Sequence, residues 1–248
     1  MPHLAIIGGS GLDQCDFLHN AQPTTVNTPY GDHSSPISSG VLADTAVLFL
    51  PRHSAGHHVP PHKVNYRANI YALKQLGVTR ILAFNVVGGI SHEMHPGRFI
   101  IPSQIIDYTY AREHTFSDGQ TTEPVVHIDF SEPYNRVLSE KIYALLEQQQ
   151  LNCKIGATYG CTQGPRLESA AEIKKLASDG CDIVGMTAMP EAALAKEQGI
   201  EYVSLCLVVN WAAGINQGEL LMDDIYECIT QGMARIKILL PDLAKTLR

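Results

Sequence analysis

Several apolar runs of this 248-residue chain end in residues that suit the binding of an anion. Residues 8–11 read GGSG, a turn whose glycines let backbone N–H groups converge and whose Ser10 adds a hydroxyl. Arg52 follows a second run, and its planar guanidinium can grip a phosphate at two points. Thr187 follows a third, just ahead of Pro190, which is typical of a helix start, where negative charge is favoured. These positions predict a site for one phosphate-like anion, although the turn could simply reverse the chain and Arg52 could form a surface salt bridge.

A second group of polar residues could recognise the edge of a heterocyclic ring. Asn210 ends another apolar run, and Glu168 lies in the turn QGPRLE at residues 163–168. An amide offers both a donor and an acceptor, whereas a carboxylate only accepts. Either side chain could instead cap a turn or helix. The glycine-rich exit NVVGGI at residues 85–90 could bring further backbone donors to the same ligand.

The histidines around Arg52 raise the question of a metal site. His53, His57, His58 and His62 lie close together. A zinc site of this kind needs an HExxH frame, or cysteine partners and a carboxylate, and the spacing supplies neither. The six cysteines include no CxxC pair, so we expect reduced thiols and no metal. The histidines could be loop fillers or hydrogen-bond donors to a phosphate or sugar.

The polar residues described above would be positioned by an alternation of strands and helices. Strands are predicted at residues 4–7, 46–50, 80–87, 104–108, 155–161, 183–186 and 202–209, and helices at residues 64–76, 133–150, 169–178, 190–198 and about 223–247. Gly77, Gly180 and Gly199 follow three of the helices, where a left-handed C-cap is favoured. No linker or repeat divides the chain, so the pattern predicts one α/β domain over residues 1–248. Ligands of such sheets bind beyond the carboxyl ends of the strands, where the polar residues lie.

The composition argues against several classes of partner. Lys and Arg total 18 against 25 for Asp and Glu, a net charge of −7, so the basic excess of a nucleic-acid-binding protein is missing. No apolar run approaches the roughly 18 residues that a membrane helix needs. The N-terminus lacks the basic and apolar regions of a signal peptide. We therefore expect a cytoplasmic protein without nucleic-acid or membrane partners.

Taken together and in this order, the segments resemble the trimeric nucleoside phosphorylase family, which contains purine nucleoside phosphorylase and methylthioadenosine phosphorylase. The resemblance covers nearly the whole chain and is specific because the motifs occur jointly. It is carried by IIGGSGLD (6–13), TPYG (28–31), PRH (51–53), KVNYRANI (63–70), GCTQGPRLESAAE (160–172) and VGMTAMPEAALAKEQGI (184–200). The resemblance implies a central mixed β-sheet flanked by helices, and a homotrimer.

The resemblance also implies roles for individual residues. Phosphate would be bound by Ser10, Arg52, His53, Asn85, the backbone of Val86, and Thr187. The nucleoside would contact Met186 at the ribose, and Glu168, Asn210, Trp211 and Ala212 at the base. His127, in VHIDF (126–130), would reach the sugar site of a neighbouring subunit. No cofactor is implied, and inorganic phosphate is a co-substrate.

The implied reaction is phosphorolysis, in which phosphate attacks C1′ of a purine nucleoside as the glycosidic bond loosens into an oxocarbenium-like state. Asn210 would hydrogen-bond N7 and O6 as negative charge builds on the leaving purine, and Arg52 would hold the phosphate. These two are the expected catalytic residues. Positioning and charge complementarity would supply most of the rate.

The expected substrate follows from positions at which this chain differs from some members of the family that it resembles. Family members that act on 6-aminopurines carry an Asp-x-Asp pair where this chain has Asn210, Trp211 and Ala212. A 6-oxopurine offers an N1–H donor and an O6 acceptor, which match a carboxylate at Glu168 and an amide at Asn210. Adenine presents a lone pair at N1, and its mismatch with a carboxylate predicts rejection.

The 5′ end of the sugar would meet Leu220 and Met222, ahead of the last predicted helix. An apolar lining favours a methylthio group over a hydroxyl, although these residues could simply pack the start of the helix. The expected reaction converts S-methyl-5′-thioinosine to hypoxanthine and 5-methylthioribose 1-phosphate. Phosphorolysis of inosine and guanosine, or of methylthioadenosine, are the alternatives.

Three other classes compete with this interpretation. A nucleoside-binding module would keep the base contacts and lose the phosphate ligands, yet Ser10, Arg52 and Thr187 are all present. A dinucleotide oxidoreductase needs a GxGxxG turn and an acidic residue about 20 residues on, and neither is found. A serine hydrolase that uses Ser10 would need the G-x-S-x-G elbow, which GGSGL lacks.

Overall fold

The computed structural model describes residues 3–248 except 57, 118, 120–124 and 217–220. Its centre is a nine-stranded sheet in the order β2-β3-β4-β1-β5-β8-β7-β6-β9, and β9 also pairs with β5. The last five strands therefore close on themselves, while β2, β3 and β4 extend from the open side. The strands are β1 (Leu4–Gly8), β2 (His19–Thr24), β3 (Ile37–Leu42), β4 (Thr45–Pro51), β5 (Arg80–Gly89), β6 (Phe99–Asp107), β7 (Cys153–Cys161), β8 (Ile183–Gly185) and β9 (Glu201–Trp211).

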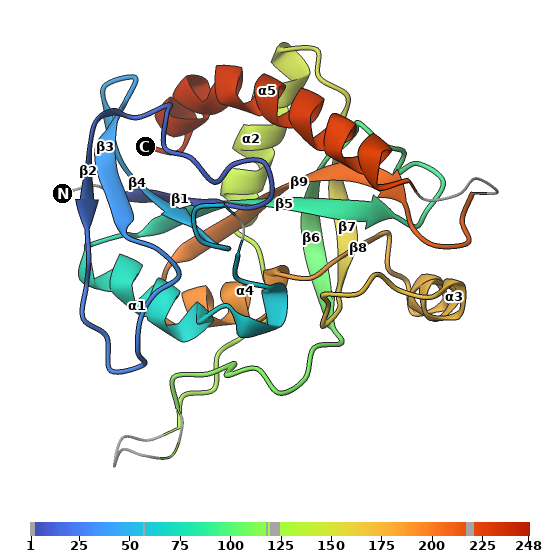
Figure 1. Cartoon of the computed structure of the whole chain (residues 1–248), viewed down its shortest axis with the longest axis horizontal. Coiled ribbons are helices and arrows are strands. Elements are labelled where there is room, and N and C mark those ends of the chain that lie inside the picture. The colour runs from blue at the N-terminus through green and yellow to red at the C-terminus, as the bar shows by residue number, and fades with distance from the viewer. Residues whose placement is uncertain (1–2, 57, 118, 120–124, 217–220) are drawn as a thin grey trace.

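Helices cover both faces of the sheet, as Figure 1 shows, with α2 and α5 on one side and α1 and α4 on the other. The helices are α1 (Tyr66–Gln75), α2 (Arg136–Gln148), α3 (Ala170–Ser178), α4 (Ala188–Glu197) and α5 (Met222–Thr246), and a short 3₁₀ turn spans Pro61–Lys63. β1 is buried along its whole length: Ala5 and Ile7 join the core beneath α1 and α4, whereas Leu4 and Ile6 join the core beneath α2 and α5. Successive residues of a strand point to opposite faces, which explains the unbroken apolar run of β1.

All five predicted helices and all seven predicted strands are present, and the sheet is mixed. β4, β1, β5 and β9 run parallel, whereas β2–β3, β3–β4, β5–β8 and β6–β9 pair antiparallel. Gly77, Gly180 and Gly199 have positive φ angles of 83°, 91° and 63°, as the predicted C-caps require. The prediction of a single α/β domain with a mixed sheet is therefore confirmed.

Two strands were not predicted, and the start of β6 departs furthest from its prediction. β2 and β3 form an antiparallel ribbon at the open edge, and β2 (HNAQPT) is mostly exposed, so it shows no apolar pattern. β6 begins at Phe99 rather than residue 104. Pro102 interrupts the sequence pattern, but it lies where the β6–β7 register shifts, and an irregularity of this kind tolerates a proline.

The start of α4 differs from a regular helix. Met189 has φ −115° and ψ 138°, so the regular turns begin at Pro190, where the sequence predicts the helix to start. Thr187 is the N-cap residue but makes no side-chain capping bond, so its hydroxyl is not used by the helix. Among the described helices, none combines the length and apolar character needed to cross a membrane.

Candidate active site

A cavity of about 970 Å³ lies at the carboxyl ends of the parallel strands. Gly8 at the end of β1 is in register with Pro51 at the end of β4, and Gly88 of β5 is in register with Asn210 of β9, so four strand ends meet at one edge. The cavity is lined by most of the residues that the sequence predicts for the site: Ser10, Arg52, His53, Asn85, Val86, Glu168, Met186, Thr187, Asn210, Ala212 and Met222. Segments that are far apart in the chain thus form one site.

The glycine turn approaches the cavity unusually closely. A Cβ atom at Gly9 would lie 2.6 Å from the carbonyl oxygen of Phe84 and 3.1 Å from Nη1 of Arg52. Only glycine leaves room for this approach. The Arg52 N–H donates to the Gly8 carbonyl over 2.9 Å, so the turn and the arginine are held together through the backbone as well.

Arg52 is fully buried, and a carboxylate holds it at two points. Its Nε and Nη2 donate to Oε2 and Oε1 of Glu191 over 2.6 and 2.7 Å, and its Nη1 donates to the Phe84 carbonyl over 2.9 Å. Burial alone would lower the pKa of Arg52, but the Glu191 carboxylate raises it above its usual value. A guanidinium has five N–H groups, so one on Nη1 and one on Nη2 remain for an anion in the cavity. The alternative of a surface salt bridge is wrong, because neither side chain of the pair is exposed.

A chain of buried hydrogen bonds orients Thr187. Ser204 Oγ donates to Oδ1 of Asn85 over 2.7 Å, and Asn85 Nδ2 donates to Oγ1 of Thr187 over 2.7 Å. Ser204, Asn85 and Thr187 are all buried. Because the Thr187 oxygen accepts from Asn85, its own hydroxyl hydrogen can be donated to an anion. His53 stands nearby with Nδ1 2.8 Å from the Val59 carbonyl, a contact that requires a proton on Nδ1.

The cavity is also lined by the amide of Asn210 and the carboxylate of Glu168. Asn210 Nδ2 donates to the Trp211 carbonyl over 2.7 Å, which leaves Oδ1 and one N–H of the amide for a ligand. Thr162 Oγ1 donates to Oε1 of Glu168 over 2.6 Å, so that Oε2 stays available. The cavity therefore offers donors for an anion and, from Asn210 and Glu168, partners for a ring with both donor and acceptor atoms.

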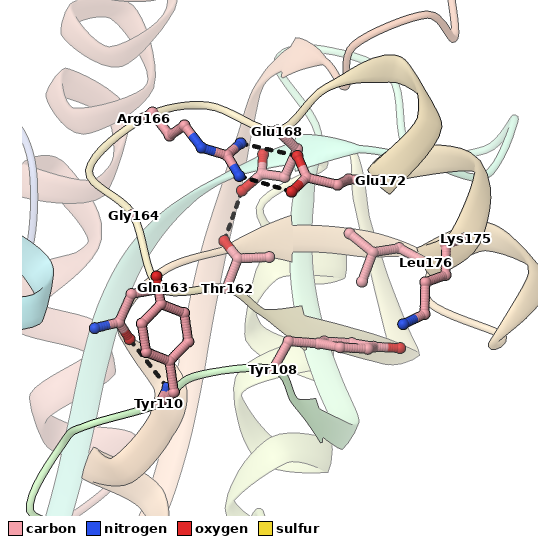
Figure 2. Close-up of a pocket in the computed structure, with 10 residues that line it drawn as sticks. All are labelled: Tyr108, Tyr110, Thr162, Gln163, Gly164, Arg166, Glu168, Glu172, Lys175 and Leu176. Atoms are coloured by element: carbon pink, nitrogen blue, oxygen red, sulfur yellow. Dashed lines mark hydrogen bonds and ion pairs between the residues drawn. The ribbon is translucent and has the colours of Figure 1, made fainter.

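Glu168 also borders a second, smaller cavity of about 210 Å³ (Figure 2). Thr162 lines this smaller cavity and is not among the residues that line the larger one, so it contacts Glu168 from the side of the smaller cavity. Figure 2 shows Arg166 beside Glu168, paired at two points with Glu172 over 2.8 and 2.7 Å. The hydrogen bond from Arg166 lowers the pKa of Glu172 to about 2.

The last helix closes one side of the large cavity. Besides Met222, the first turns of α5 contribute Ile225, Tyr226, Ile229 and Thr230. The sequence interpretation missed these four, although the apolar periodicity of α5 could have indicated which face turns inward. Leu220, the other residue predicted for this region, lies outside the described residues, as does His57.

Two predicted residues stand apart from the cavity within the described part of the chain. Trp211 is not among the lining residues, and its backbone pairs with Gly89 of β5. His127 is exposed, next to Val125 and Val126, which are 64 % and 63 % exposed. An exposed position is what a contact to a neighbouring subunit requires, and the role of both residues stays a prediction.

The supporting residues behind the site were not found from the sequence. Glu191, Ser204 and Thr162 carry no motif that indicates their partners, and Glu191 is 139 residues from Arg52. A further example is Arg112, which is buried and donates to the carbonyls of Gln163, Met186 and Met189 over 2.8, 2.9 and 2.6 Å. Arg112 thereby ties the segment that leads to Glu168 to the segment that carries Thr187.

Comparison with known proteins agrees with this architecture. Residues 3–245 match the model of the phosphorylase superfamily, and the chain belongs to that superfamily. It is 50 % identical over 233 residues, 94 % of each chain, to a probable S-methyl-5′-thioinosine phosphorylase of Pseudomonas syringae pv. tomato. It is 45 % identical over 232 residues to a 6-oxopurine nucleoside phosphorylase of Pyrococcus furiosus, which covers 92 % of this chain and 86 % of the relative.

Solved structures share the whole fold. The structure of methylthioadenosine phosphorylase from Schistosoma mansoni in complex with adenine superposes with a TM-score of 0.92 at 29 % identity, covering 99 % of this chain and 91 % of the other. The resemblance to the nucleoside phosphorylase family is therefore confirmed for the fold and for the family, and this chain is an enzyme of the nucleoside phosphorylase type.

Proposed function

We propose that the protein is a phosphorylase of 6-oxopurine nucleosides whose preferred substrate is S-methyl-5′-thioinosine, which it converts to hypoxanthine and 5-methylthioribose 1-phosphate. One observation carries the proposal: a single cavity is lined both by Arg52 and Thr187, which can donate to an anion, and by the Glu168 and Asn210 pair. Inorganic phosphate is the co-substrate, and the chemistry needs no cofactor.

The catalytic step follows from this arrangement. A phosphate oxygen forms a bond to C1′ while the bond from C1′ to N9 breaks, and the electron pair of the broken bond passes to the purine. Arg52 and Thr187 hold the phosphate so that one of its oxygens faces C1′, which lowers the entropic cost of bringing the reactants together. Asn210 donates its free N–H to O6, and so stabilises the negative charge that develops on the base as the bond breaks; the released purine anion then takes a proton from water.

The preference for a 6-oxopurine rests on Glu168. A carboxylate that only accepts pairs with N1–H of hypoxanthine or guanine, whereas N1 of adenine brings a lone pair to the same oxygen. Sites built on hydrogen bonds reject such analogues by factors of about 10⁴ or more. The relatives named for 6-oxopurine and thioinosine substrates support this assignment, and methylthioadenosine phosphorylase activity is the alternative for the base.

The preference for a 5′-methylthio group rests on α5. Met222, Ile225 and Ile229 supply apolar surface on this side of the cavity. Thr230 uses its hydroxyl to donate to the Tyr226 carbonyl over 2.8 Å, so it offers no free donor to a 5′-hydroxyl. Tyr226 lines the same side and carries a phenolic hydroxyl, which is the observation that favours activity on inosine and guanosine as well.

The proposal extends to assembly. We infer a cytoplasmic homotrimer in which His127 and the exposed Val125 and Val126 pack against a neighbouring subunit, with His127 near that subunit's sugar site. Exposed valines side by side support a protein contact at this segment. Sedimentation equilibrium tests the trimer, and a His127→Ala variant should raise the KM for the nucleoside more than the KM for phosphate.

The deciding experiment incubates the protein with S-methyl-5′-thioinosine, inosine, guanosine and methylthioadenosine, each with and without phosphate, and measures the free base. Phosphate-dependent release of hypoxanthine, fastest from methylthioinosine, is the expected result. Equal rates with inosine would remove the argument for the apolar 5′ pocket. Release of adenine alone would overturn the assignment of Glu168, and release from none of them would favour a nucleoside-binding module.

A further inference from the structure

Thr162 follows β7 directly and is held in place from two sides. Its backbone N–H donates to the Gly185 carbonyl over 2.8 Å. Its own carbonyl accepts from Nη2 of Arg112 over 3.3 Å, and the next residue, Gln163, accepts from the same nitrogen over 2.8 Å. The position of the Thr162 hydroxyl is therefore set by the scaffold and not by a ligand.

The hydroxyl of Thr162 has one hydrogen and two oxygen atoms within reach. Glu168 Oε1 lies at 2.6 Å and the Gly185 carbonyl at 3.3 Å, so the hydrogen belongs to the Glu168 bond. Hydrogen bonds that end on a charged oxygen are short and stronger than neutral ones. One oxygen of Glu168 is thereby tied to the scaffold, and the other stays free.

Glu168 needs such a restraint because a cation competes for it. Glu168 is half-buried and has three rotatable side-chain bonds, and the guanidinium of Arg166 lies beside it (Figure 2). The hydrogen bond to Glu172 and, to a smaller extent, the charge of Glu168 raise the pKa of Arg166 above its usual value. Without the Thr162 bond, the carboxylate can turn toward Arg166 and away from the large cavity.

We propose that Thr162 is a positioning residue for base selection: its hydroxyl holds Glu168 so that Oε2 faces the purine, and it thereby sets the preference for 6-oxopurines over 6-aminopurines. This inference rests on the proposed assignment of Glu168 to the purine ring. Thr162 itself lines the smaller cavity only, so it acts on the base through Glu168.

The test compares Thr162→Val, which keeps the shape of the side chain and removes the donor, with Thr162→Ser, which keeps the donor. Thr158→Val is the matched control, because it removes a threonine hydroxyl from β7, the strand that leads directly to Thr162. Hypoxanthine and adenine affinities are measured by calorimetry in the presence of phosphate, and the melting temperature of each variant is recorded. Phosphorolysis of methylthioinosine and methylthioadenosine is assayed in parallel.

The expected result is a loss of about tenfold in hypoxanthine affinity for Thr162→Val with adenine affinity unchanged, while Thr162→Ser and Thr158→Val keep the wild-type ratio. An unchanged ratio in Thr162→Val, or an equal loss for both bases, would overturn the inference. Selective binding of hypoxanthine by a wild-type protein that releases no base would instead refute the proposed function, and the affinity ratio of the variants would still decide the role of Thr162.

Discussion

The guanidinium of Arg52 and the carboxylate of Glu191 form a two-point ion pair in which neither side chain has exposed surface, with N–O distances of 2.6 and 2.7 Å. The Tyr202 hydroxyl adds a third bond to this carboxylate, 2.8 Å from Oε1. The pair fixes the plane of the guanidinium, and one N–H on Nη1 and one on Nη2 remain beyond the bonds to Glu191 and the Phe84 carbonyl. Glu191 is not among the residues that line the cavity, so we expect it to act on the proposed phosphate site through Arg52.

Glu191→Gln should therefore affect both stability and phosphate binding. Breaking one partner of a buried pair leaves an uncompensated charge, and we expect the free energy of unfolding to fall by about 3 kcal/mol. The KM for phosphate should rise at least tenfold, because the guanidinium loses its fixed orientation. Urea denaturation and initial rates measure the two effects. Tyr202→Phe is the control and should cost only about 1 kcal/mol; an unchanged phosphate KM in Glu191→Gln would contradict this role.

Ser204→Ala should weaken phosphate binding although Ser204 does not itself line the cavity. Ser204 sets the orientation of the Asn85 amide, and without it the amide can flip and accept from the Thr187 hydroxyl, which then no longer donates to the anion. We expect the KM for phosphate to rise about fivefold, equivalent to roughly 1 kcal/mol, with little change in the KM for the nucleoside. Ser139→Ala removes another buried serine hydroxyl, in α2, and should leave both constants unchanged.

The base pocket can be tested by exchanging its polarity. A variant that combines Glu168→Ser, Asn210→Asp and Ala212→Asp supplies carboxylates that can accept from the 6-amino group, and it removes the carboxylate that we propose to face N1. Activity on methylthioadenosine should rise and activity on methylthioinosine should fall, with a change of the ratio of at least 10². Competition between the two substrates in one reaction measures that ratio directly. No gain on methylthioadenosine would count against the placement of the base.

Two buried thiols should be unreactive in the folded protein. Burial raises the pKa of Cys161 and of Cys206 to about 12, from a usual value of 9.0. At pH 8 the thiolate fraction of each is then about 10⁻⁴, so a disulfide reagent should label both only after unfolding, while the half-buried Cys15 should react before them. Rapid labelling of Cys161 in the folded protein would show that its environment opens.

The same two thiols predict a dependence of stability on pH. Their pKa is raised on folding, so their contribution is fully present below about pH 9, where the thiols of the unfolded chain are protonated. As the pH rises from 9 toward 12, the unfolded thiols ionise and the folded ones do not, so the free energy of unfolding should fall. Urea denaturation at pH 8 and pH 10 should show a smaller decrease in Cys206→Ala than in the wild type.

Local patterns predicted the elements because their causes are local. The apolar run of β1 indicates a strand buried on both faces, and Gly77, Gly180 and Gly199 mark helix ends through their positive φ angles. The sequence analysis did not predict β2, because its residues are mostly exposed and its pairing with β3 leaves no apolar pattern in the sequence. The predicted strand is shorter than β6 because Pro102 interrupts the sequence pattern. Only the structure shows that Pro102 lies at a register shift, where a proline is tolerated.

The sequence by itself determined the fold class and the residue types at the carboxyl ends of the strands, because strand periodicity, glycine turns and helix starts involve neighbours along the chain. Only the tertiary structure decided which donor and acceptor atoms of those residues remain available to bind a ligand. Arg52 and Glu191 are 139 residues apart, Asn85 is 119 residues from Ser204, and Thr187 is 102 residues from Asn85. No local pattern encodes such pairs. Their hydrogen bonds form when parallel strands bring their ends to one edge, and burial there makes each unpaired donor costly.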